Sequence, residues 1–185
     1  MEDSKIIELF FARSEQAISE LASKYGKLCL KIAKNILSNT SDAEECVNDT
    51  YLGAWNSIPP AKPDPLQAYI CRIVRNISIM KYHSNTAAKR NSFYSCALDE
   101  LELCLTSPVS VEDSVSANEL AGLLDSFLDT LTGTERIMFV RRYWYADSIS
   151  DIAENFNIRA GTAAVRLSRI RKKLRKYLEK EGYVI

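Results

Sequence analysis

The chain of 185 residues has little of what enzymes and metal sites need. It contains a single histidine, His83, and its five cysteines form no Cys-x-x-Cys pair. A structural zinc site needs about four Cys or His ligands at close spacing, so this pattern excludes the usual kind of zinc site. The sequence also lacks a Gly-rich phosphate loop and any spacing that pairs a nucleophile with a base. We therefore predict a protein that is not an enzyme and that holds no metal or cofactor.

Long hydrophobic runs are also missing. No apolar run approaches the ~20 residues that a membrane-spanning helix needs. The N-terminus, Met1–Lys5, is acidic and lacks the basic start and apolar stretch of a secretory signal. Scattered cysteines in odd number are typical of reduced thiols, and Cys29, Cys46 and Cys71 fall on apolar helical positions where we expect core packing. The sequence predicts a cytoplasmic protein without membrane insertion.

Charge is segregated along the chain although the formal net charge is zero. Eight basic residues and no acid lie between Arg159 and Lys176. Five acids and no base lie between Ser95 and Ser116. Such asymmetry indicates a basic surface for an acidic partner, which the net charge alone hides.

The N-terminal part has the apolar periodicity of helices. It predicts four of them, at about Ile6–Lys24, Tyr25–Ile36, Asp42–Ser57 and Leu66–Ile77. Ser41 or Asp42 is the expected N-cap of the third helix. The segment Pro59–Pro65 must be a loop, because its four prolines stop any helix. These helices make a plausible first domain, residues 1–86.

A linker and a second helical domain follow. Periodicity fades over residues 87–116, where polar and acidic residues predict a linker, although its stretch Leu98–Leu105 is apolar enough to dock. Residues 117–185 are helical again, and Thr132 with Glu135 fits a capping box. No strand pattern of period two is present. We predict an all-α fold: two small helical domains joined by a flexible acidic linker.

The second domain contains the most specific local pattern. A short apolar helix begins near Ser148, and Asn157 then stands where a tight turn needs a left-handed residue. Ile158 is an apolar plug, and a long basic helix starts at about Ala160. A short helix, a tight turn and a long basic helix are typical of a helix-turn-helix. The alternative is that the basic helix is only a solvated surface.

The second helix of such a motif fits the major groove of DNA. Arg159 is the one obvious side chain for bidentate binding of guanine, and other residues of the first turns would meet base edges. The basic residues that follow would reach phosphates on either side. The base-edge candidates are Arg159, Ala160, Thr162, Ala164, Val165 and Ser168; the phosphate candidates are Arg166, Arg169, Arg171, Lys172 and Lys173.

Two groups of residues stand out in the first domain. Acids and then Trp55 share the third helix; the helix macrodipole alone explains the acids near its start but explains Asp49 poorly. The fourth helix mixes cations, an amide and aromatics, which suits single-stranded nucleic acid, although an exposed Arg face is often bland. The third-helix group is Asp42, Glu44, Glu45, Asp49 and Trp55; the fourth-helix group is Arg72, Arg75, Asn76, Ile79, Tyr82 and His83.

The ordered set of these motifs resembles the RNA polymerase sigma factors of the sigma-70 family, of the small extracytoplasmic-function type. Residues Asp42–Trp55 resemble the polymerase-clamp helix of that family, and Tyr69–Asn76 resemble its next segment. Residues Ser150–Glu154, Gly161–Thr162 and Arg166–Leu174 resemble its C-terminal helix-turn-helix. The resemblance covers about three-quarters of the chain.

The resemblance implies a role for each group. Asp42, Glu45, Asp49 and Trp55 would bind the β′ clamp helices of core RNA polymerase, and the β flap would be a second contact on the polymerase. The Pro59–Pro65 loop and the fourth helix would hold the melted −10 element, with Asn76 at the pocket of a flipped base. The basic helix would read the −35 element as duplex, and the acidic linker would thread through the polymerase channels. An anti-sigma factor is the typical further partner.

The sequence departs from the family pattern at several places, among them the proline-rich loop Pro59–Pro65 and the segment His83–Ala88, which lacks the usual dense basic run. Met80 stands where the family often has Asp, and Ala163-Ala164-Val165 replace a common Val-Lys-Ser. These departures bear on which promoter is read. Two other functions compete with the sigma factor: a stand-alone helix-turn-helix regulator, which leaves the first domain without a role, and a sigma mimic that binds polymerase without opening promoters.

Overall fold

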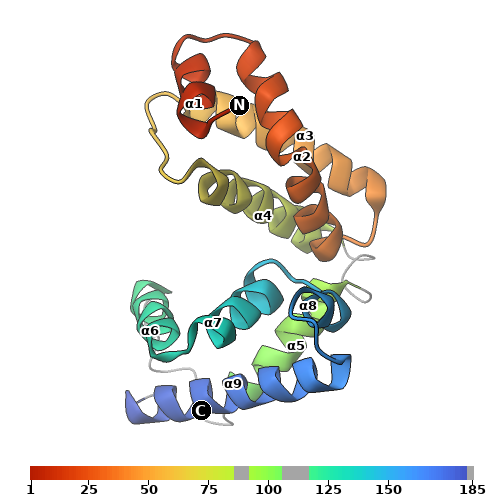
Figure 1. The fold of residues 1–185 in the computed structure, drawn as a ribbon, viewed down its shortest axis with the longest axis vertical. Helices are drawn as coiled ribbons and strands as arrows, with labels where there is room; N and C mark the ends of the chain where they lie inside the picture. The colour runs from red at the N-terminus through yellow and green to blue at the C-terminus, as the bar shows by residue number, and fades with distance from the viewer. Residues whose placement is uncertain (86–91, 106–116, 183–185) are drawn as a thin grey trace. The chain divides into compact units, whose positions relative to one another are not determined.

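The computed structural model describes residues 1–85, 92–105 and 117–182, and side chains within 1–85, 92–101 and 121–182. Every regular element in these ranges is a helix (Figure 1), which confirms the all-α prediction. The chain divides into two compact units, Met1–Ser95 and Cys96–Ile185. No helix in the described part of the chain is long and apolar enough to cross a membrane.

The N-terminal unit is built around three helices. They are α2 (Gln16–Ile36), α3 (Thr40–Ser57) and α4 (Leu66–Ser84), and each packs against the other two, while α1 (Asp3–Phe11) packs on α2. Phe10 and the apolar stripes of the three helices fill the core. Cys29, Cys46 and Cys71 are buried in this core, as the sequence predicted.

The predicted boundary between the first two helices is wrong. The break falls at Ala12–Glu15, not near Tyr25, and Arg13 takes a left-handed conformation there with φ of 52°. The N–H of Ser14 donates to the carbonyl of Leu9 at 3.0 Å, which is the long hydrogen bond of a Schellman motif. No glycine or proline marks this turn, so the apolar pattern runs through it without a signal.

The start of α3 also differs from the prediction. Asn39 is the N-cap, and its side-chain oxygen accepts from the N–H of Ser41 at 2.8 Å. The expected caps, Ser41 and Asp42, lie inside the first turn of α3. The predicted loop at Pro59–Pro65 is confirmed, because α3 ends at Ser57 and α4 begins directly after Pro65.

The C-terminal unit is organised around its last helix, α9 (Ala160–Lys180). That helix packs against three others, α6 (Ala117–Thr130), α7 (Gly133–Phe139) and α8 (Ile149–Asn155). A π-helical turn, η2 (Val140–Trp144), continues α7. The core contains Phe127, Met138, Ile152, Leu167, Ile170 and Leu174.

Part of the predicted linker is helical. Residues Phe93–Leu105 form α5, and the division between the two units falls within its first turns, between Ser95 and Cys96. Ala97 of α5 is buried in the core of the C-terminal unit. Leu101, inside the apolar stretch Leu98–Leu105, packs against the same core, so this stretch docks as the sequence suggested; residues 106–116 lie outside the described ranges.

Candidate functional site

Helices α8 and α9 form the predicted helix-turn-helix. The Ser148 hydroxyl accepts from the N–H of Asp151 at 3.0 Å and caps α8. Asn157 ends that helix with φ of 50°, and the N–H of Ile158 donates to the carbonyl of Ala153 at 3.0 Å. This is again a Schellman motif, and Ile158 packs on the core. The predicted left-handed Asn157 and the apolar plug after it are confirmed.

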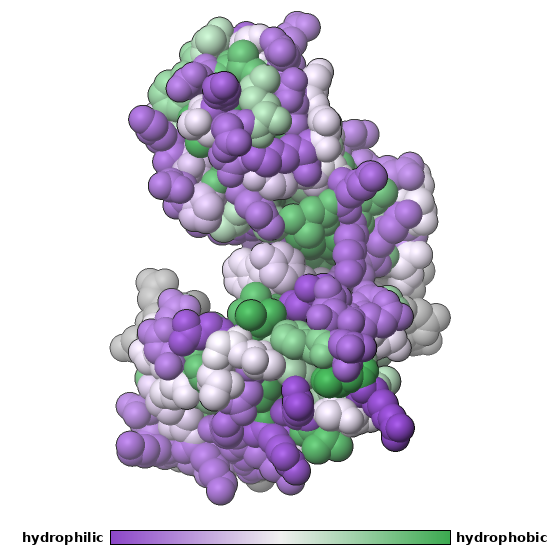
Figure 2. All heavy atoms as spheres, viewed as in Figure 1, coloured by the Kyte–Doolittle hydropathy of each residue, from purple (hydrophilic) through white to green (hydrophobic). Residues whose placement is uncertain are grey.

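One stripe of α9 is buried, which fixes the side of the helix that faces outward. The stripe repeats with helical spacing, so the opposite face is left to solvent. It consists of Ala163, Leu167, Ile170, Leu174 and Leu178. A row at i, i+4, i+7 and i+11 lies opposite: Val165, which is 52% exposed, and then Arg169, Lys172 and Lys176, all exposed. The surface along α9 is accordingly dominated by hydrophilic residues (Figure 2).

The predicted duplex-reading residues lie along the first turns of α9. Most are exposed, and Arg159 precedes the helix in the extended N-cap conformation. Ala164 and Ser168 are half-buried at the edge of the outward face. The exposed ones include Arg159, Ala160, Thr162, Val165, Arg166 and Arg169. Lys176 was not among the predicted residues, although its spacing from Arg169 and Lys172 places it in the same row.

Two other cations of α9 are already paired within the chain. Lys173 donates to Glu135 with an Nζ–Oε1 distance of 2.6 Å, and Arg171 donates to Glu100 with an Nη1–Oε2 distance of 2.7 Å. Lys173 was a predicted DNA residue, and Arg171 was expected to reach phosphates. The structure therefore places both on internal carboxylates.

Glu135 combines this ion pair with the predicted capping box. The N–H of Glu135 donates to the Thr132 hydroxyl at 3.4 Å, and the Thr132 N–H donates to Glu135 Oε2 at 3.2 Å. The hydrogen bond from Lys173, followed by those from Thr132, lowers the pKa of the Glu135 carboxyl against the opposing effect of burial. One carboxylate thus joins the start of α7 to α9.

The acids at the start of α3 face the end of α4. Lys81 Nζ lies 2.9 Å from Glu45 Oε2 and 4.0 Å from Asp42 Oδ1. The side-chain amide of Asn85 also donates to Asp42 Oδ2 at 2.7 Å. Two of the predicted polymerase-binding acids therefore have partners on the neighbouring helix.

Farther along α3 the outward face is apolar and acidic together. Asp49 is exposed, and Leu52, three residues on, is 57% exposed. Trp55 is half-buried: its ring centroid lies 6.2 Å from that of Phe10 and 5.4 Å from the Arg13 guanidinium. A groove of about 660 Å³ runs between α2 and α3, lined by Glu15, Ile18, Ser19, Asn48, Tyr51, Leu52 and Trp55. The sequence analysis missed Leu52. It could have been found as an apolar residue that does not share the spacing of the buried stripe of α3.

On α4, most of the predicted residues lie on an accessible face. Arg72 and Asn76 are exposed, and the Arg72 guanidinium sits 5.2 Å from the centre of the Tyr69 ring. Ile79 and Arg75 are half-buried, and burial lowers the pKa of Arg75. These residues offer cations, an amide and an aromatic ring side by side.

The prediction that Tyr82 lies on this outer face is wrong. The residue is only 6% exposed, and its ring packs edge-on against Tyr94 with centroids 5.2 Å apart. His83 makes a second edge contact with the same ring at 5.5 Å. A tyrosine enclosed in this way has no open face on which a base could stack.

Comparison with known proteins matches both halves of the chain. Residues 21–87 match the family model of sigma-70 region 2, and residues 121–174 match that of sigma-70 region 4. The chain is 23% identical over 172 residues to the ECF RNA polymerase sigma factor SigW of Bacillus subtilis (strain 168), covering 89% of this chain and 90% of SigW. A solved structure of CnrH in complex with the cytosolic domain of CnrY is also similar, at 21% identity and a TM-score of 0.45, covering 96% and 97% of the two chains.

These matches define the class of protein as a transcription initiation factor, with sigma-70 region 2 followed by region 4 along the chain. The chain belongs to the sigma-70 family of RNA polymerase sigma factors, as a member of the extracytoplasmic-function type.

Proposed function

We propose that this sigma factor binds core RNA polymerase in the cytoplasm, reads the −35 element with α9 and holds the melted −10 element with α4. The observation that carries the proposal is the outward row of α9, in which Val165, Arg169, Lys172 and Lys176 lie opposite a fully buried stripe. A row of this length presents side chains to bases at its start and to phosphates beyond. The protein itself performs no chemistry.

The way in which α9 is held supports the proposed reading of duplex DNA. The N-cap Arg159 and the exposed Thr162 stand where a recognition helix enters the major groove. Val165 offers an apolar surface suited to a thymine methyl group, and Arg169 offers a cation for the backbone. The buried stripe of α9 fixes these side chains on a rigid platform.

The proposed −10 surface consists of Arg72, Arg75, Asn76 and Ile79 of α4. Arg72 lies over Tyr69, so a cation and a ring are available together for backbone and base. Asn76 is exposed beside them and can hydrogen-bond to a base edge. Tyr82 is not part of this surface, because it is buried against Tyr94.

The proposed polymerase surface is the outward face of α3 with the adjoining groove. Leu52 supplies exposed apolar area, and Asp49 supplies the negative charge that a basic clamp helix would meet. Trp55 forms part of the groove wall. We assign this surface to the β′ clamp helices, with the β flap as the partner of the C-terminal unit and an anti-sigma factor as a competing partner.

Run-off transcription tests the proposal. The full chain is mixed with core RNA polymerase and fragments of the source genome, including the DNA upstream of its own gene. Discrete transcripts that need both the chain and the core enzyme are expected. Duplex binding by the chain alone, without transcripts, would favour the stand-alone regulator. Core binding without transcripts from any fragment would favour the sigma mimic.

A matched pair of variants separates the two surfaces. Arg166→Ala with Arg169→Ala should weaken promoter engagement and spare core binding, whereas Asp49→Ala with Trp55→Ala should do the reverse. Transcription that survives both pairs unchanged would show that the assigned residues are wrong.

A further inference from the structure

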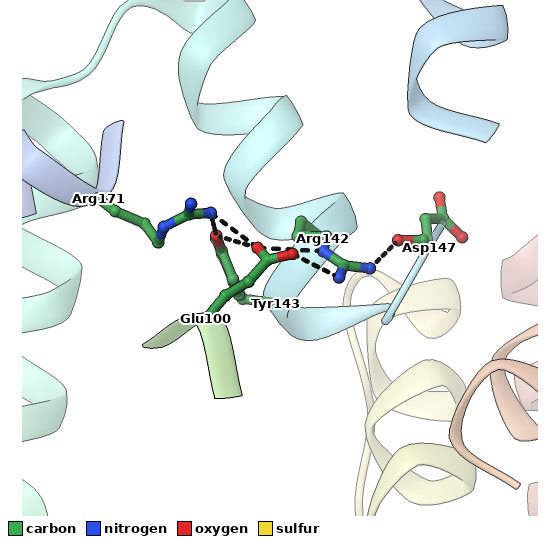
Figure 3. Close-up of polar contacts among 5 residues, drawn as sticks. All are labelled: Glu100, Arg142, Tyr143, Asp147 and Arg171. Carbon is green, nitrogen blue, oxygen red and sulfur yellow. Dashed lines mark hydrogen bonds and ion pairs between the residues drawn. The ribbon is translucent and has the colours of Figure 1, made fainter. Parts of the chain in front are cut away.

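Glu100 of α5 is held by three side chains of the C-terminal unit. Arg142 lies 2.7 Å from its Oε1 through Nη2, and Arg171 lies 2.7 Å from its Oε2 through Nη1. The Tyr143 hydroxyl donates to Oε2 at 3.0 Å, and a longer contact of 3.4 Å joins Arg142 Nε to the same oxygen. Figure 3 shows the carboxylate between the two guanidinium groups.

The three donor side chains are also held by contacts that do not involve Glu100. The Arg142 side chain is 3% exposed, and its Nη1 also donates to the carbonyl of Asp147 at 2.9 Å. Tyr143 is 8% exposed, and its hydroxyl accepts from Arg171 Nη1 at 2.8 Å. Burial raises the pKa of Tyr143, so its hydroxyl keeps the proton that it donates. η2 and α9 thus hold two cations and a hydroxyl around one point.

A buried guanidinium without an anion is strongly unfavourable, so this point requires negative charge. The planar fork of arginine matches a carboxylate through two parallel donors, and both nitrogens of Arg142 that face Glu100 are used in this way. The chemistry therefore selects a carboxylate, and the chain itself carries one on α5.

We propose that Arg142, Tyr143 and Arg171 form a carboxylate-binding site, and that Glu100 is its ligand and docks α5 onto the C-terminal unit. The acidic segment is then not only a linker: its helical part is an element of the C-terminal unit. Arg171 belongs to the same helix as the outward basic row, so the docked carboxylate also fixes one edge of α9.

Amide hydrogen exchange of the full chain tests the site. Glu100→Gln keeps the shape of the side chain and removes its charge; Asp99→Asn makes the same change at the neighbouring exposed residue of α5. We expect exchange in α5 and η2 to quicken by at least about tenfold in Glu100→Gln and to stay unchanged in Asp99→Asn. The helices α2–α4 serve as the internal control. Equal behaviour of the two variants would overturn the proposal.

Rescue by a small carboxylate distinguishes a binding site from a merely structural contact. In Glu100→Ala, sodium acetate should slow exchange in η2 relative to sodium chloride at the same ionic strength, and it should leave Asp99→Asn unaffected. Acetate and chloride acting alike would show that the donors have no preference for a carboxylate, which contradicts the proposal.

Arg171→Gln should quicken exchange less than Glu100→Gln does, because it leaves Arg142 paired with Glu100. Combined with Glu100→Gln, it completes a double-mutant cycle in the same exchange measurement. We expect the double variant to exchange little faster than Glu100→Gln alone. Fully additive effects would show that the two side chains do not act together.

Discussion

The two units each carry one strongly charged helix, α3 with acids and α9 with bases, and both helices divide their charges in the same way. On α3, Asp42 and Glu45 are paired with the end of α4, while Asp49 stays exposed beside Leu52. The comparison teaches that belonging to a charged run does not make a residue part of an interface, because the run also supplies the ion pairs that hold the unit together.

On α9 the division follows the position around the helix. Arg171 and Lys173 lie at the two sides of the helix, nearer its neighbours, and are tied to Glu100 and Glu135. The cations of the outward row of α9 are exposed to solvent. In both units the charges nearest a neighbouring helix serve the fold, and those farthest from it remain for a partner.

The largest effect, on the stability of the C-terminal unit, is expected from a substitution in the buried stripe of α9. Leu167 is 1% exposed within the core beneath α9. Leu167→Ala should lower the free energy of unfolding of the C-terminal unit by about 2–5 kcal/mol, because it leaves a cavity. Denaturant unfolding should show this loss while the N-terminal unit keeps its stability. A loss below about 1 kcal/mol would mean that α9 is not anchored by this stripe.

Removing two cations from the outward row of α9 should strongly weaken DNA binding without affecting the fold. Arg169→Ala with Lys172→Ala removes two exposed cations, so promoter affinity should fall and the slope of log affinity against log salt should decrease by about 2. Fluorescence anisotropy of holoenzyme on promoter DNA over a salt series measures both quantities. The paired Lys173→Ala is the matched control and should change the slope much less.

The N-terminal unit offers the same comparison. Leu52→Ala should weaken binding to core polymerase by about 1–2 kcal/mol, because it removes exposed apolar area from the proposed interface. Asp42→Asn should leave core binding nearly unchanged, since that carboxylate already faces Asn85. Titration of labelled protein with core enzyme compares the two variants; a greater loss in Asp42→Asn would reverse the assignment.

The smallest effect concerns pH. The folded state lowers the pKa of Glu135 below its usual 4.5, chiefly through Lys173. A lowered folded-state pKa gives stability that is present above the unfolded value and is lost as the pH falls through the folded value. The midpoint temperature of thermal unfolding should therefore fall less steeply between pH 6 and pH 3 in Glu135→Gln than in the unaltered chain. If the midpoint fell equally steeply with pH in both proteins, the stabilising role of the ionised Glu135 carboxylate would be contradicted.

Local chemistry explains which features could be predicted from the sequence. Asn157 tolerates the left-handed turn after α8, and Thr132 with Glu135 caps α7 through bonds that span only three residues. Such features are set by near neighbours, so the residue pattern reveals them. The helix-turn-helix and the outward position of Arg169 follow from the same short-range rules.

The remaining features depend on partners far away in the chain. Tyr82 lies on the buried face of α4, four residues after the buried Ser78, and the ring of Tyr94, which lies outside that helix, packs against it. Glu100 lies in an acidic segment without clear periodicity, and its partners lie 42 and 71 residues away. No pattern within a short window contains the contacts of Glu100, so its partners could not be predicted from the sequence spacing.

The turn at Arg13 has a consequence for how this position can vary. Its left-handed backbone would suit glycine best, by about 1 kcal/mol, because a Cβ is disfavoured there. The same residue, however, donates from Nη1 to the carbonyl of Trp55 at 2.6 Å and covers the indole ring. Arg13→Gly would thus relax the backbone and uncover Trp55 at once. Selection for a more stable turn and selection for an enclosed indole therefore oppose each other at a single residue.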